Sequence, residues 1–131
     1  MSASADLPET LLRLACDDEF AAKSLLPVAG VADSILGFHA QQAVEKALKA
    51  ALAARSVPFP YTHDLDGLLE LCESSGLQIP DELDGVDRLA PYGVHMRYGM
   101  SHAQGLDREQ ALRWAAAAIE WAQKVIESPS G

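Results

Sequence analysis

Residues Phe38 to Ala50 read FHAQQAVEKALKA, within a longer run, Ala32 to Arg55, that has no proline and one interior glycine, Gly37. Small residues recur along this run at helical spacing: Ala40, Ala43, Ala47, Ala50 and Ala54. Such a stripe lets another helix approach closely. A second stripe of Val44, Leu48 and Leu52 runs beside it. A helix that is apolar round most of its circumference is usually packed on several sides. We therefore predict that this run is the central helix of an all-α domain.

One narrow side of this helix stays polar. It carries His39, Gln42, Lys46 and Lys49, flanked by Gln41 and Glu45. Because packing alone does not require these residues, they form a candidate surface for a nucleotide, RNA or a protein partner. The candidate nucleotide- or RNA-binding residues are Lys46 and Lys49 on this strip, together with Tyr98.

Length and composition predict one soluble domain. The chain has 131 residues, of which 49% are hydrophobic and 6% aromatic, and we expect a single domain over 1–131 with a core of about 7–127. No segment has the length and apolar character of a membrane span or a signal peptide. Cys16 and Cys72 lack a metal or disulfide pattern, which favours reduced thiols in the cytoplasm. The net charge of -9 argues against a general nucleic-acid coat protein but allows a local basic site.

A first helix is predicted from Asp6 to about Leu26, because Asp6, Pro8 and Glu9 resemble a capped helix start. Its expected inward stripe is Leu7, Leu11, Leu14, Asp18, Ala21 and Leu25. A charge on that stripe has two explanations. Asp18 either reaches solvent at the boundary or forms an ion pair, since an unpaired buried charge is costly. The candidate partners for the ion pair are Lys46, Lys49 and Arg97.

Three further helical segments follow the central run. Thr62 or Asp64 caps a short helix with Leu65, Leu68, Leu69 and Cys72 inward. A fourth element starts at residues 80–84, is interrupted or kinked by Pro91, and continues to about Tyr98. Asp107 and Gln110 resemble a capping pair for a last helix that ends near Glu127. The predicted fold is an all-α, up-and-down bundle of four to five helices.

The candidate chemistry lies in Arg88 to His102, RLAPYGVHMRYGMSH. Gly99 makes an unbroken helix between Arg97 and His102 unfavourable, so a turn could fold His102 back beside Arg97. Arginine stabilises the charge of a phosphodiester transition state, and histidine moves protons near neutral pH. RNA supplies its own nucleophile, the 2′-hydroxyl, so the pair needs no metal. Ordinary roles stay open: Arg97 in an ion pair and His102 in a solvated loop. A second pair, Arg88 and His95, has six intervening residues.

The chain has neither a glycine-rich phosphate loop nor a nucleophile elbow, which argues against the common nucleotide-loop and serine-hydrolase classes. No cofactor is expected. A metal site is also not expected, because the four histidines show no ligand spacing.

Four motifs follow one another along the chain: residues 15–22 with Asp18, the FHAQQAVEKALKA core, the segment Pro60 to Leu65, and Leu89 to Tyr92 leading to Arg97 and Tyr98. Their order resembles the HEPN domain family over roughly residues 10–125. The resemblance implies a helical bundle that commonly forms a homodimer. It also implies a minimal nucleotidyltransferase partner, with which such proteins form toxin–antitoxin pairs. Many members are metal-independent ribonucleases, and carried onto this sequence their catalytic arginine and histidine are Arg97 and His102.

Two positions depart from the family's pattern. Catalytic members often carry a tyrosine two residues after the histidine, and here that residue is Gln104. The subgroup with the most similar core usually has proline after Arg-Tyr and often lacks the histidine, whereas this chain has Gly99 and retains His102. Two main hypotheses follow: a ribonuclease that acts with a nucleotidyltransferase partner, and a non-catalytic module that binds a nucleotide or a protein through the polar strip. A purely structural helical adaptor is the third.

Overall fold

The computed structural model describes residues 3–94 and 105–128, and every regular element among them is helical. The α-helices are α1 (Ala3–Leu25), α2 (Asp33–Ala54), α3 (Leu65–Ser74), α4 (Ala90–Val94) and α5 (Arg108–Glu127). Two short 3₁₀ turns, η1 (Asp81–Leu83) and η2 (Val86–Leu89), lie between α3 and α4. The predicted all-α bundle of four to five helices is confirmed.

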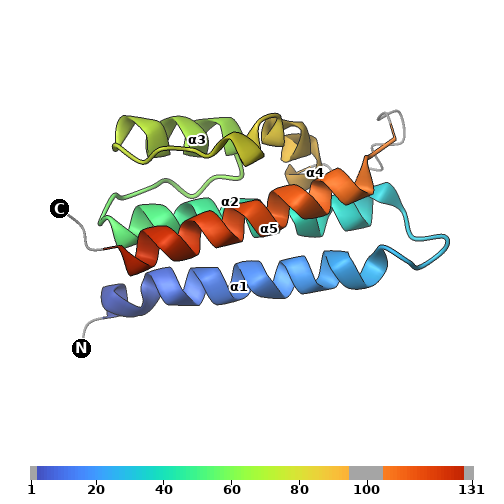
Figure 1. The fold of residues 1–131 in the computed structure, drawn as a ribbon, viewed down its shortest axis with the longest axis horizontal. Helices are drawn as coiled ribbons and strands as arrows, with labels where there is room; N and C mark the ends of the chain where they lie inside the picture. The colour runs from blue at the N-terminus through green and yellow to red at the C-terminus, as the bar shows by residue number, and fades with distance from the viewer. Residues whose placement is uncertain (1–2, 95–104, 129–131) are drawn as a thin grey trace.

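The central position of α2 is visible in Figure 1, where α1 and α5 run beside it and α3 and α4 lie on its other side. α1 runs antiparallel to α2, whereas α5 runs in the same direction as α2. All four alanines of the predicted close-packing stripe, Ala40, Ala43, Ala47 and Ala50, are fully buried. Leu36, Leu48 and Leu52 are fully buried beside them. The prediction of a central helix therefore holds.

The inward face of α1 differs from its predicted stripe. Leu7 and Leu14 are each 40% exposed, while Ala15 and Ala22 are fully buried. Two alanines on the contact line let α1 approach α2 closely, and the larger leucines then lie at the edges of the interface. α1 also begins at Ala3 rather than Asp6, with Pro8 inside the helix. Pro8 is the sixth residue of this helix and has no backbone N–H, so one intrahelical hydrogen bond is lost close to the helix start.

The ends of the other helices largely follow their sequence signals. Asp107 caps α5, and its carboxylate accepts a hydrogen bond from the Gln110 amide at 3.0 Å. Asp64 occupies the cap position of α3 without a side-chain cap bond, and Leu65, Leu68 and Cys72 are buried from that helix. Pro91 lies in the first turn of α4, where proline is well tolerated.

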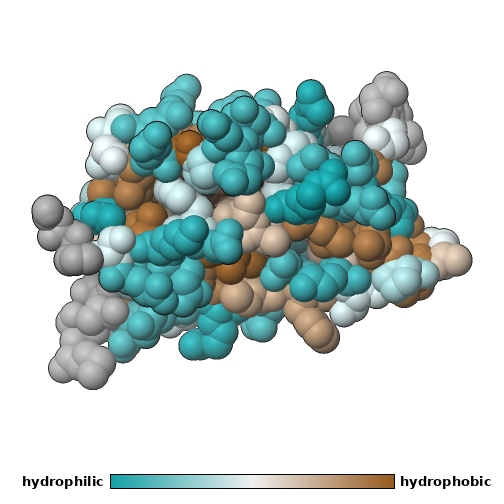
Figure 2. Space-filling view, in the orientation of Figure 1, coloured by the Kyte–Doolittle hydropathy of each residue, from teal (hydrophilic) through white to brown (hydrophobic). Residues whose placement is uncertain are grey.

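Polar residues cover most of the face shown in Figure 2, and hydrophobic residues gather in two places, between α5 and α1 on the right and between α3 and α5 on the left. This distribution is typical of amphipathic helices packed on a common core. None of the described helices combines the length and apolar character that a membrane crossing requires.

Candidate functional site

The candidate catalytic pair lies in the stretch between α4 and α5. Arg97, Tyr98 and His102 fall within residues 95–104, outside the described residues, so their placement stays a prediction. The predicted continuation of the fourth element to Tyr98 lies there as well. The structure does describe the chain on both sides of this stretch, and both sides pack against α2.

On the side that enters the stretch, two glycines set the packing of α4 on α2. A Cβ atom placed on Gly37 would lie 2.5 Å from the Tyr92 ring. A Cβ atom on Gly93 would lie 2.5 Å from the side chain of Gln41. Side chains do not approach so closely, so a methyl group at Gly37 would displace the Tyr92 ring, and one at Gly93 would displace the end of the Gln41 side chain. Since α4 is short, these contacts fix its position on α2.

On the side that leaves the stretch, Asp33 at the start of α2 holds the chain. Its carboxylate accepts hydrogen bonds from the Leu106 amide at 3.0 Å and from Arg108 Nε at 2.6 Å. Arg108 also donates to the carbonyl of Val31. The hydrogen bond from Leu106 lowers the pKa of Asp33; partial burial acts in the opposite direction, and the hydrogen bond and charge of Arg108 lower it further. Asp33 is therefore stabilised as a carboxylate that joins α2 to the start of α5.

A buried polar network centres on Glu45, whose side chain is only 4% exposed. The carboxylate accepts hydrogen bonds from Lys49 Nζ at 2.9 Å, His63 Nδ1 at 3.0 Å and Gln41 Nε2 at 3.1 Å. Gln42 in turn donates to Gln41 at 2.8 Å. Burial acts to raise the pKa of Glu45, but the hydrogen bonds from these partners outweigh it and the pKa is lowered. The network therefore begins at His63, in the connection before α3, and reaches Gln41 through Glu45. Gln41 in turn contacts Gly93 of α4.

Asp18 pairs with Lys46, one of the three partners proposed from sequence. Both oxygens of its carboxylate are used, one by Lys46 Nζ and the other by His39 Nδ1 at 3.0 Å. The Asp18 side chain is 14% exposed, so it faces the α1–α2 interface rather than open solvent. A paired charge avoids the cost that an unpaired one would carry there.

These contacts bear on the proposed role of Lys46 and Lys49 as nucleotide- or RNA-binding residues. Lys46 is paired with Asp18 and Lys49 with Glu45, and Lys49 also lies 5.8 Å from the centre of the Phe59 ring. A carboxylate at each ammonium group neutralises most of the field that an incoming phosphate would experience. Both lysines of the polar strip therefore form ion pairs within the protein.

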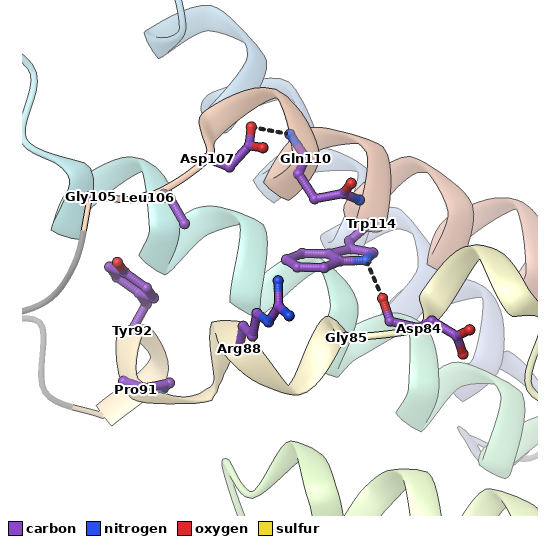
Figure 3. Close-up of a pocket in the computed structure, with 10 residues that line it drawn as sticks. All are labelled: Asp84, Gly85, Arg88, Pro91, Tyr92, Gly105, Leu106, Asp107, Gln110 and Trp114. Carbon is purple, nitrogen blue, oxygen red and sulfur yellow. Dashed lines mark hydrogen bonds between the residues drawn. The ribbon is translucent and has the colours of Figure 1, made fainter.

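A cavity of about 800 Å³ opens beside the stretch 95–104. Figure 3 shows Tyr92 and Trp114 on opposite sides of this space, with the Arg88 side chain rising toward the Trp114 ring. The residues that line it come from η2, α4 and the start of α5: Asp84, Gly85, Arg88, Pro91, Tyr92, Gly105, Leu106, Asp107, Gln110 and Trp114. Both flanks of the stretch therefore contribute to its wall.

The wall of the cavity is held firmly at Trp114. Its indole Nε1 donates to the carbonyl of Asp84 at 3.1 Å. Gly85, which precedes η2, has a φ of 84°, and a Cβ atom there would lie 3.3 Å from the Trp114 ring. Glycine suits this position both by its left-handed backbone and by the close approach. Burial, and secondarily the charge of Asp33, raises the pKa of Tyr92, so its hydroxyl stays protonated at neutral pH.

The model of the HEPN domain family, described as "HEPN domain", matches residues 9–128. This chain belongs to the HEPN domain family. The matched residues include all of α2, the cavity and both flanks of the stretch 95–104. Searches of curated proteins and of solved structures gave no significant match.

Several residues that shape this region of the HEPN domain escaped sequence reasoning. Asp33 precedes an apolar run and looks like an ordinary helix-start carboxylate, and Gln41 lies within the polar strip. Nothing in the sequence around Trp114 indicates that it lies in the wall of a cavity. The only sequence signal for the close packing is the pair of glycines, Gly37 and Gly93, each inside a helical pattern. Within the described part of the chain, no group of three or more His, Cys, Asp and Glu side chains is arranged to hold a metal.

Proposed function

We propose that this HEPN protein is a metal-independent endoribonuclease that uses Arg97 and His102. One observation carries the proposal: the ten residues 95–104 are tied at both ends to the first part of α2. Gly93 packs on Gln41 at one end, and Leu106 and Arg108 bind Asp33 at the other. The described residues on both sides of the segment that carries Arg97 and His102 therefore contact the same end of α2, and this supports the proposal.

The chemistry assigned to each residue follows from its side chain. Arg97 binds the oxygens of the scissile phosphate and stabilises the extra negative charge as the 2′-hydroxyl attacks. His102 transfers a proton to or from the reacting oxygens, which its pKa range allows near neutral pH. A net charge of -9 is compatible with an RNA substrate, because only the local field at the site must be positive.

The test is cleavage of single-stranded RNA in EDTA by the wild type, Arg97→Ala and His102→Ala. Each variant should lose at least about a hundredfold in rate, because it lacks a charge-stabilising or proton-transferring group. Arg13→Ala, an exposed arginine on α1, is the matched control and should cleave as the wild type does. An inactive wild type would leave the non-catalytic binding module as the better reading. So would a His102→Ala variant that cleaves normally.

The partnership is a second part of the proposal and rests on family membership. Members of the family that resemble this chain pair with a minimal nucleotidyltransferase, and we propose such a partner in a toxin–antitoxin-type pair. A homodimer would place two copies of Arg97 near one seam and double the local positive charge. If a minimal nucleotidyltransferase is encoded next to this protein, mixing the two proteins should suppress RNA cleavage.

A further inference from the structure

Gln41 is fully buried in the first half of α2, although its side chain is polar. Its amide nitrogen donates to the Glu45 carboxylate at 3.1 Å, and its amide oxygen accepts from Gln42 Nε2 at 2.8 Å. An ionised carboxylate only accepts hydrogen bonds, so Glu45 determines which end of the Gln41 amide faces it. The amide is therefore held in one orientation by hydrogen bonds at both of its polar atoms.

α4 packs directly on this amide. A Cβ atom placed on Gly93 would lie 2.5 Å from Cδ, 2.6 Å from Nε2 and 2.7 Å from Oε1 of Gln41. The end of a glutamine side chain can usually move aside, but movement here would break hydrogen bonds inside a buried network, and buried groups without partners are costly. Gln41 therefore gives α4 a fixed surface, and Gly93 is the residue that contacts it.

We propose that Gln41 is a positioning residue of the ribonuclease site, because it holds α4 in place through Gly93. α4 has five residues, and its contacts with Gly37 and Gln41 lie about one helical turn apart on α2. Arg97 follows Gly93 by four residues, so a displaced Gly93 would displace the start of the segment that carries Arg97. Small displacements of a reacting group lower a rate strongly. The proposal rests on the proposed ribonuclease function for its reaction.

The first test is the rate at which variants of the full chain cleave single-stranded RNA in EDTA. Gln41→Ala should lower kcat about tenfold and leave KM within about twofold, because it displaces reacting groups rather than the surface that binds RNA. Glu45→Ala should have the same effect, since it releases the Gln41 amide. Glu45→Gln should retain kcat, because its amide oxygen can replace Oε1, which accepts from Gln41 and His63.

Two variants separate positioning from stability. Glu45→Gln places an amide NH2 group against Lys49 Nζ, where Oε2 accepts in the wild type, so it should melt at a lower temperature although it retains kcat. Leu48→Ala should also melt at a lower temperature and retain kcat, because Leu48 is a fully buried apolar residue in the second half of α2. A merely structural role of Gln41 predicts instead that Gln41→Ala retains kcat as well, when all rates are measured per folded molecule.

The contact between Gln41 and Gly93 is tested without RNA, from the melting temperatures of the wild type, Gly93→Ala, Gln41→Ala and the double variant. Gly93→Ala alone should lower the melting temperature by about 5 °C, because its methyl group displaces the bonded amide. In the Gln41→Ala background the methyl group has no amide to displace, so the further decrease should be less than about half as large. Gly93→Ala also serves as a second variant in the rate test, where it should lose kcat even if Gln41→Ala does not fold.

The outcomes distinguish the two proposals. A wild type that cleaves RNA, with kcat unchanged in Gly93→Ala and in folded Gln41→Ala, would refute the positioning role and leave the ribonuclease function in place. Equal effects of Gly93→Ala in the two backgrounds would refute the contact on which the positioning role depends. A wild type that cleaves no RNA would overturn both proposals.

Discussion

The two halves of α2 make different kinds of contact. The second half, residues 44–54, is buried chiefly by aliphatic packing: Val44, Ala47, Leu48, Ala50, Ala51 and Leu52 are all fully buried. The first half, residues 33–43, adds specific contacts to the chain around α4 and α5. Asp33 binds Leu106 and Arg108, Gly37 accommodates Tyr92, and Gln41 lies against Gly93. α2 thus contributes to the stability of the bundle along its whole length. Only its first half contacts the residues that flank the candidate site.

The largest effect on stability is expected in the second half of α2. Leu48→Ala should lower the free energy of unfolding by about 2–5 kcal/mol, because it removes buried methyl groups and leaves a cavity. Urea denaturation followed by circular dichroism measures this loss. Leu14→Ala makes the same chemical change at a side chain that is 40% exposed, and should cost clearly less. Equal losses in the two variants would show that Leu48 is not a core residue.

A smaller, pH-dependent effect is expected at Asp33 in the first half. Its lowered pKa means that its contribution to stability is complete above the ordinary aspartate value of about 4, and is lost as the pH falls through the lowered pKa. Wild type should therefore melt at a higher temperature than Asp33→Asn between pH 6 and 8. The difference should shrink below pH 4. Melting curves at several pH values check this, and a difference that stays constant into acid would contradict the carboxylate's pairing with Leu106 and Arg108.

The contrast between the halves also explains what the sequence could predict. The alanine stripe from Ala40 to Ala50 repeats at helical spacing, and such periodicity predicts a packed helix without knowledge of its partner. The capping pair Asp107 and Gln110 was predictable for the same reason, since cap bonds form between residues close in sequence. Local patterns therefore predicted the helices and the centre of the bundle.

Contacts between distant residues were not predictable in this way. Asp33 and Leu106 are separated by more than seventy positions, and nothing near Asp33 in sequence indicates that partner. The contacts of Gly37 with Tyr92 and of Gly85 with Trp114 depend on how α4 and α5 are placed relative to α2. The inward face of α1 was mispredicted because periodicity alone did not show that Ala15 and Ala22, rather than Leu7 and Leu14, lie on the contact line.

The proposed catalytic pair was predicted neither from a local pattern nor from a contact between distant residues. Arg97 and His102 were chosen from their chemistry and from the resemblance to HEPN domains, and they remain predictions. Asp18, by contrast, was chosen because a charge on an apolar stripe requires a partner, and the structure pairs it with Lys46. Physical reasoning about burial located an ion pair, whereas catalysis requires a measurement.

The most direct test of the different roles of the two halves is the rate of RNA cleavage per folded molecule, in EDTA, for Gly37→Ala and Leu48→Ala. The new methyl group of Gly37→Ala would displace Tyr92 and α4, at a cost of about 1–3 kcal/mol for overpacking. We expect this variant to lose at least tenfold in rate, since misplaced groups lower preorganisation. Leu48→Ala, measured at a temperature where it is folded, should cleave at nearly the wild-type rate despite its larger loss of stability. Rates that fall in proportion to the loss of stability in both variants, or a wild type that cleaves no RNA, would contradict this division of roles.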